Sequence, residues 1–217
     1  MNIKNIIFLI CCLLLLPAFA FSMVSLTPAE KQQLSQGQMV KKVIWKEGHV
    51  WPEVKILTVL PHNPQDNLNT FLDFETHKTY IPDMLESRII KKVSPKQIQV
   101  YFEMEMPWPV KKTSHVTNNI VTSNEDGSYT LKWNLVKAEM LKATDGYMSF
   151  HPYEGKTLLE YVSLIVPNSS FAVMFKDRVA TDVEKSVVKI SKYLNKTINK
   201  KNSLFTTTQK EENQKKL

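Results

Sequence analysis

The sequence has few of the residues that covalent cross-links and reactive sites require. Its two cysteines, Cys11 and Cys12, are adjacent and lie near the start, and only five glycines occur in 217 residues. No disulfide, catalytic thiol or thiolate metal site is therefore expected in the rest of the chain. There is also no glycine-rich phosphate loop and no Gly-x-Ser-x-Gly nucleophile motif, so the sequence offers no catalytic residues by motif.

The histidines do not form a metal site either. No two of the five are four residues apart, and none belongs to a known ligand motif. We therefore expect neither a metal nor a cofactor. His115 alternates with the polar Thr113 and Thr117 and is expected to be exposed. His151, beside a turn at a strand end, is better placed for the rim of a cavity.

The first 20 residues have the pattern of a secretory signal peptide. Lys4 precedes an apolar run over residues 6–16, and Pro17 and the Ala18-x-Ala20 pattern follow. The run is short for a transmembrane helix, which needs about 20 residues. The pattern predicts an exported protein, periplasmic or secreted, whose mature chain lacks both cysteines. A retained membrane anchor is the alternative.

Composition and charge indicate one globular domain with a basic end. The net charge is +7, and 43% of the residues are hydrophobic and 10% aromatic. Residues 196–217 hold six lysines and two glutamates. We predict a disordered basic tail over residues 200–217, which either solubilises the chain or contacts an anionic membrane surface. Without an aromatic-basic stripe, no nucleic-acid partner is expected, and the protein is expected to be a monomer.

The first part of the mature chain mixes short helices and strands. Thr27-Pro28-Ala29-Glu30 has the pattern of a capping box with proline in the first turn. Asn63-Pro64 is a second helix start. Val54, Ile56 and Leu60 alternate on one strand face. The elements are expected at residues 27–37, 39–45, 53–60, 63–74 and 76–82.

From residue 85 the pattern becomes a succession of strands joined by short turns. Asn124-Glu125-Asp126-Gly127 and Asp145-Gly146 are two of the turn signals. Short links require antiparallel pairing. Apolar residues alternate with polar ones in several strands, as at Val100, Phe102 and Met104, so one face of the sheet is expected to be apolar. The strands are expected at residues 85–93, 97–106, 111–123, 128–137, 146–153 and 156–167.

A long amphipathic helix is predicted over residues 181–199. Its apolar stripe is formed by Val183, Val187, Ile190, Leu194 and Ile198. The apolar face of the sheet is its only available partner. The sequence thus predicts an α+β fold in which a curved antiparallel β-sheet wraps around a long C-terminal helix. The gap between two such apolar surfaces can exceed what side chains fill.

Three stretches of this chain resemble the START-like superfamily, which includes lipid-transfer domains and polyketide cyclase/dehydrase-type proteins. They are residues 67–74 with 80–82, the Met-Pro-Trp-Pro-Val-Lys segment 106–111, and residues 155–161. The resemblance implies the helix-grip fold. The chain departs from the family's pattern at residues 111–113, where Lys-Lys-Thr replaces an acidic residue and an arginine. The implied division is a signal peptide (1–20), an N-terminal helix and strand extension (21–52), a START-like domain (53–199) and the basic tail (200–217).

We expect a binding protein rather than an enzyme, because the sequence places no titratable group inside the apolar cavity. The predicted ligand is a lipid or other apolar small molecule between sheet and helix. Trp108, held between two prolines, is expected either to plug the end of the core or to line the cavity mouth. An alternative is a cyclase/dehydratase-type enzyme that uses His151, Tyr161 or Glu160. A second alternative is a non-catalytic envelope interaction module. The predicted ligand-binding residues are Phe102, Met104, Trp108, Trp133, Phe150, Val183, Val187 and Ile190.

Overall fold

The computed structural model describes residues 24–106, 108 and 111–214. The predicted signal peptide, residues 1–20, lies outside the described residues, and so do Cys11 and Cys12.

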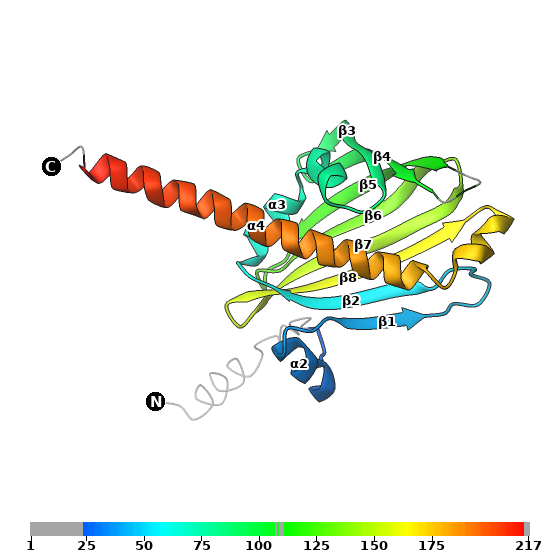
Figure 1. Cartoon of the computed structure of the whole chain (residues 1–217), viewed down its shortest axis with the longest axis horizontal. Helices are drawn as coiled ribbons and strands as arrows, with labels where there is room; N and C mark the ends of the chain where they lie inside the picture. The colour runs from blue at the N-terminus through cyan, green and yellow to red at the C-terminus, as the bar shows by residue number, and fades with distance from the viewer. Residues whose placement is uncertain (1–23, 107, 109–110, 215–217) are drawn as a thin grey trace, which may run out of the picture.

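The fold is built on one sheet of eight antiparallel strands, curved around a long helix (Figure 1). The strand order is β1-β2-β8-β7-β6-β5-β4-β3, so β3 to β8 form a meander and β2 pairs with β8. The predicted antiparallel α+β helix-grip architecture is confirmed. The strands are β1 (Val40–Ile44), β2 (Glu53–Leu60), β3 (Met84–Ser94), β4 (Gln97–Glu105), β5 (Lys112–Ser123), β6 (Tyr129–Ala138), β7 (Leu141–Tyr153) and β8 (Lys156–Pro167).

The N-terminal helix α2 (Pro28–Ser35) begins with the predicted capping box. The Glu30 backbone N–H donates to Thr27 Oγ1 at 3.3 Å, and the Thr27 N–H donates to the Glu30 carboxylate at 2.7 Å. Leu34 of this helix packs with Leu57 of β2 and Leu158 of β8 in a small separate cluster. The helix therefore covers part of the sheet's outer face, away from the main core (Figure 1).

Two short helices follow β2 and close one end of the domain. Helix α3 (Pro64–Phe71) has Asn63 as N-cap, as predicted, and its buried Asn67 donates to the Pro61 carbonyl oxygen and to Thr157 Oγ1. The next segment, η1 (Phe74–Thr79), is a 3-10 helix that begins two residues before the predicted element. The hydrogen bond to Thr157 ties α3 to β8.

The prediction is wrong about the start of β7. The strand begins at Leu141, and Gly146 lies inside it opposite Trp133 of β6. A Cβ atom on Gly146 would overlap the Trp133 ring and the Val162 carbonyl oxygen. This glycine therefore makes room for an indole ring within the sheet, and it does not form a turn.

Helix α4 (Val179–Gln214) crosses the inner face of the sheet. Its predicted apolar stripe is buried or half-buried, and Val187, Ile190 and Leu194 join the main core with residues of β2, β4, β6, β7 and β8. A second 3-10 helix, η2 (Ser170–Phe175), connects β8 to it. No helix among the described residues is long and apolar enough to cross a membrane.

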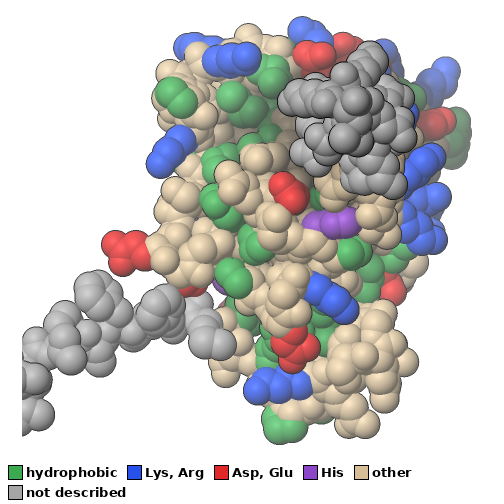
Figure 2. All heavy atoms as spheres, turned by 90° about the vertical axis from the view of Figure 1, so that its left-hand side faces the viewer, with side chains coloured by type: hydrophobic (Ala, Val, Ile, Leu, Met, Phe, Trp, Pro, Cys, Tyr) green, Lys and Arg blue, Asp and Glu red, His purple; other side chains and the backbone are tan. Residues whose placement is uncertain are grey.

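The helix does not end near Asn199, as the sequence pattern predicts. It continues to Gln214 and projects beyond the sheet (Figure 1), so the tail predicted to be disordered from residue 200 is helical that far. No glycine or proline occurs between residues 179 and 214, and lysine, glutamine and glutamate favour helix. On the face from which α4 leaves the domain, Lys and Arg side chains lie mainly around the edge with Asp and Glu among them (Figure 2).

Candidate ligand-binding cavity

A cavity of about 810 Å³ lies between the inner face of the sheet and α4. Small-molecule sites in proteins have volumes of about 300–1,000 Å³. Strands β4, β5, β6 and β8, the helical segments η1 and η2, and the first turns of α4 all contribute to its wall. The cavity thus has one wall from the sheet and one from the helix, as the predicted gap requires.

Most of the wall is apolar or aromatic. Val183 and Ile190 come from α4, Leu131 and Trp133 from β6, and Phe102 from β4. The rings of Trp133 and Tyr161 pack with their centroids 5.5 Å apart. Such a surface suits the hydrocarbon part of a ligand, because contact with it removes apolar area from water.

A polar stripe interrupts this wall along β5. Thr113, His115, Thr117 and Asn119 occupy alternate positions of the strand, and all four line the cavity. Pairing fixes their direction: Thr113 is opposite Met104 and His115 is opposite Phe102, and directly paired residues lie on the same side of a sheet. The prediction that His115 is exposed is therefore wrong, because its cross-strand partner already faces inward.

The stripe is incompletely hydrogen-bonded within the described residues. Thr113 is 7% exposed, and its hydroxyl has no partner. His115 Nδ1 is enclosed and likewise unpaired among those residues. Asn119 Nδ2 donates to Thr117 Oγ1 at 2.8 Å. Buried polar atoms are nearly always paired in folded proteins, so two unpaired ones beside a cavity are the unusual feature of this site.

Two histidines of the cavity are held neutral near pH 7. Burial lowers the pKa of His115 to about 4. Burial also lowers the pKa of His77 to about 4, although the hydrogen bond from its Nε2 to the Phe71 carbonyl oxygen, 2.8 Å long, acts in the opposite direction. The Phe102 ring lies near both imidazoles, with centroid distances of 5.4 Å to His115 and 6.4 Å to His77.

Charged side chains of the cavity wall stay near solvent. Asp182 of α4 contacts Arg178 at 3.6 Å and Lys185 at 3.3 Å, and the three side chains are 42–61% exposed. Asp83 and Glu105 belong to the same lining. The inner part of the described cavity is thus uncharged, and its charges gather where α4 begins.

The predicted ligand-binding residues divide into three groups. Phe150 and Val187 have no exposed surface and belong to the core, without lining the cavity. Trp108 is 84% exposed, so it does not plug the core; Pro107 and Pro109 lie outside the described residues. The five that line the cavity are Phe102, Met104, Trp133, Val183 and Ile190.

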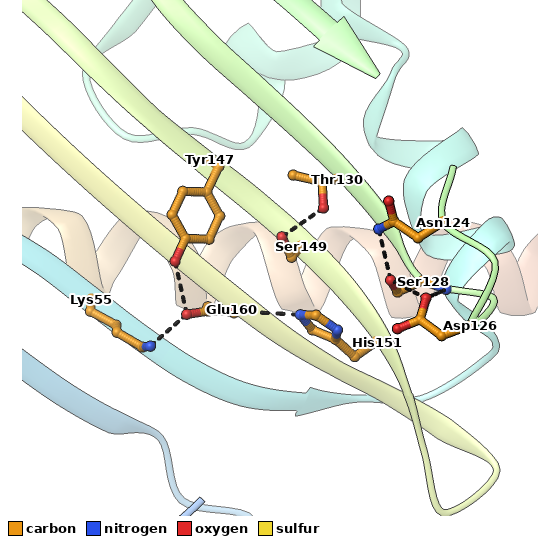
Figure 3. Close-up of polar contacts among 9 residues, drawn as sticks. All are labelled: Lys55, Asn124, Asp126, Ser128, Thr130, Tyr147, Ser149, His151 and Glu160. Carbon is orange, nitrogen blue, oxygen red and sulfur yellow. Dashed lines mark hydrogen bonds and ion pairs between the residues drawn. The ribbon is translucent and has the colours of Figure 1, made fainter. Parts of the chain in front are cut away.

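Two of the three residues considered for catalysis face away from the cavity. Tyr147, Lys55 and His151 point toward the carboxylate of Glu160 on the outer side of the sheet (Figure 3). Burial by itself would raise the pKa of Glu160, but the His151 imidazole 3.6 Å away and the hydrogen bonds from Lys55 and Tyr147 outweigh it and lower the pKa to about 2. Only Tyr161 lines the cavity, because neighbouring residues of a strand point to opposite faces.

Within the part of the chain that the structure describes, no three His, Cys, Asp or Glu side chains form a group that could hold a metal ion.

A curved antiparallel sheet, a long helix across its inner face and a cavity between them define the helix-grip fold of START-like proteins, and this chain has that fold. The STAR-related lipid transfer protein from Xanthomonas axonopodis has a similar structure, with 16% identity, a TM-score of 0.66 and coverage of 72% of this chain and 93% of that one. Human StAR-related lipid transfer protein 5 matches with 10% identity and a TM-score of 0.60, covering 78% of this chain and 93% of that one. The Zhui aromatase/cyclase from a Streptomyces species matches with 8% identity and a TM-score of 0.54, covering 67% of this chain and 92% of that one. No family model and no curated protein matches the sequence.

Proposed function

We propose that this protein binds a lipid or another largely apolar small molecule in the cavity between the sheet and α4. The observation that carries the proposal is the cavity itself, about 810 Å³ in volume and walled mainly by apolar and aromatic side chains. Two proteins of similar structure are described as lipid transfer proteins, which supports an apolar ligand.

We also propose that the mature chain works outside the cytoplasm. The support is the signal-like pattern of residues 1–20. Fractionation of the producing cells, with mass determination of the purified chain, tests this proposal. We expect the protein in the exported fraction, with the mass of a chain that begins after Ala20. A full-length protein in the cytosol would contradict export.

The ligand is proposed to enter from a membrane surface at the end of the domain where α4 begins. Met106, Ala172 and Phe175 line the cavity there. Trp108 lies two residues beyond Met106 and is 84% exposed, while Met174, next to Phe175, is 71% exposed. The end of β4, the start of β5 and η2 lie at the same end of the molecule (Figure 1). Exposed apolar side chains around a cavity opening suit contact with lipid.

Ligand binding is tested by native mass spectrometry and lipid extraction of the purified mature chain, together with titration of the neutral fluorescent probe N-phenyl-1-naphthylamine. A bound apolar molecule, or saturable probe binding at about one site per chain, is expected. A chain that carries no extractable molecule and does not bind the probe would refute the proposal.

An enzyme that acts in the same cavity is the second candidate. The observation that favours it is His115, an imidazole in the cavity wall whose Nδ1 lacks a protein partner among the described residues. However, its pKa of about 4 makes it a weak base at neutral pH, whereas efficient acid–base catalysts have pKa values near the working pH. A neutral imidazole of this kind suits hydrogen bonding to a ligand better than acid–base catalysis.

A further inference from the structure

The polar stripe of β5 is placed to contact a ligand along much of its length. Alternate residues of a strand lie roughly 7 Å apart, so Thr113 and Asn119 are separated by about 20 Å. All four side chains of the stripe line the cavity, and most of the remaining wall is apolar. A ligand between β5 and α4 would therefore contact polar side chains on one side and apolar side chains on the other.

The unpaired atoms of the stripe call for a hydrogen-bonding partner. Thr113 Oγ1 and His115 Nδ1 have none among the described residues. A buried polar group that loses water and gains no partner is unfavourable. A hydroxyl can donate and accept, and a neutral imidazole has one donor and one acceptor nitrogen. The stripe can thus pair with either a hydroxyl or a carbonyl group.

The charges of the wall disfavour an ionised group beside the stripe. Arg178 and Lys185 already pair with Asp182 near solvent, and Asp83 and Glu105 are the other charged residues of the lining. A carboxylate group next to Thr113 or His115 would lose its hydration without gaining an opposite charge, because the two cations of the lining contact Asp182 near solvent. An uncharged oxygen group avoids that penalty.

We infer that the cavity selects largely apolar molecules that carry uncharged hydroxyl or carbonyl groups, and that Thr113 and His115 hydrogen-bond these groups. This inference rests on the proposed function and narrows its ligand class. It separates oxygenated neutral molecules from hydrocarbons and from ionised amphiphiles such as fatty-acid anions.

The test measures displacement of N-phenyl-1-naphthylamine from the mature chain by decane, decan-1-ol, decan-2-one and decanoate at pH 7.5. Decan-1-ol and decan-2-one are expected to bind at least about tenfold more tightly than decanoate. Thr113→Val and His115→Leu should each lower the affinity for the alcohol and the ketone about fivefold, because the loss of one neutral hydrogen bond changes an affinity by about that factor. Both variants should leave decane unchanged.

Thr122→Val is the matched control, because Thr122 is an exposed residue of the same strand outside the cavity lining. This variant should bind all four compounds as tightly as the wild type does. His115→Gln keeps a hydrogen-bonding side chain and should restore part of the alcohol affinity. Thr113→Val preserves shape, so it tests the stripe even if His115→Leu does not fold.

The outcomes separate the two proposals. If the wild-type chain does not bind the fluorescent probe, the proposed function itself fails. If the probe binds but decanoate competes as well as decan-1-ol, the inferred ligand class is wrong. The same conclusion follows if Thr113→Val and His115→Leu weaken decane and decan-1-ol equally, because the stripe would then act only through packing.

Discussion

At the scale of single residues, His115 links the cavity to the stability of the fold. Its pKa is lowered from 6.5 to about 4 by burial, so below pH 6.5 the unfolded chain binds a proton that the folded chain does not. The free energy of unfolding should therefore fall as the pH falls from 6.5 to about 4. His77 acts in the same direction over the same range.

His115→Leu is expected to remove the contribution of His115 to the pH dependence of stability and to leave that of His77. Between pH 7 and pH 4.5 the variant should lose about 2 to 3 kcal/mol less stability than the wild type, since one pKa unit corresponds to about 1.4 kcal/mol. Urea unfolding at the two pH values measures the difference. Equal losses in both proteins would show that His115 is not held neutral.

Gly146 gives a second prediction at this scale. Gly146→Ala should destabilise the fold by about 2 kcal/mol or more, because the added methyl group would overlap the Trp133 ring and the Val162 carbonyl oxygen. Gly48→Ala is the control: Gly48 has a φ of +75° and nothing within 4 Å of an added Cβ, so only backbone strain of about 1 kcal/mol is expected. Thermal unfolding of both variants measures the two losses of stability. A smaller loss for Gly146→Ala than for Gly48→Ala would contradict the prediction.

The same residues show why the site was harder to predict than the fold. Alternation within β4 correctly predicts that Phe102 and Met104 lie on the inner face, whereas the polar neighbours of His115 on β5 alone predict an exposed side chain. Pairing the two strands through their short connection would have placed it opposite Phe102. Glycine is common in turns, so the sequence predicts a turn at Gly146, whereas in the structure this residue accommodates the Trp133 ring of the neighbouring strand β6.

At the scale of elements, the β4–β5 connection presents Trp108 to solvent. Trp108→Ser is expected to change the free energy of unfolding by less than about 0.5 kcal/mol, as for an exposed side chain. Its binding to phosphatidylcholine vesicles should weaken about fivefold or more, because tryptophan contributes strongly at lipid interfaces. Vesicle co-sedimentation measures this change.

Val136→Ser is the matched control for Trp108→Ser. Val136 is 48% exposed on β6 and does not line the cavity. Vesicle binding should be unaffected by it. If Trp108→Ser binds vesicles as the wild type does, the membrane is not the source of the ligand at this end of the domain.

The distal part of α4 leads to a different expectation. The described side chains of residues 199–204 are exposed, and the apolar stripe ends at Ile198. Deletion of residues 200–217 should therefore change the melting temperature by only a few degrees and leave probe binding intact. Calorimetry and the titration above measure both. A loss of cellular location or vesicle binding on deletion would instead support the envelope interaction module.

Local signals predicted the elements where the chemistry is local. The capping box of α2 and the Asn63 cap of α3 depend on contacts within a few residues, and both were correct. The apolar periodicity does not predict the end of α4, because a polar, lysine-rich segment without glycine or proline can continue a helix without an apolar face. Composition alone does not separate these two outcomes.

At the scale of the whole molecule, the cavity exists because two surfaces from distant parts of the chain do not pack fully together. Val183 and Ile190 of α4 line it on the helix side, and Leu131 and Trp133 of β6 line it on the sheet side. Deeper in the fold, Val187 and Leu194 meet the sheet directly and have no exposed surface. One part of the apolar stripe of α4 therefore packs in the core, and another part borders the cavity. Sequence periodicity does not distinguish these two parts.

This division predicts that the cavity can be filled without loss of stability. Val183→Trp places an indole in space bordered by apolar side chains, so the melting temperature should stay equal or rise. Probe affinity should fall about tenfold, since the indole competes for the same volume. Val188→Trp is the control, because Val188 lies on α4 outside the lining and should leave the affinity unchanged. If Val183→Trp binds the probe as tightly as the wild type while remaining folded, the probe does not occupy the space between sheet and helix, and the ligand site must be sought elsewhere on the molecule.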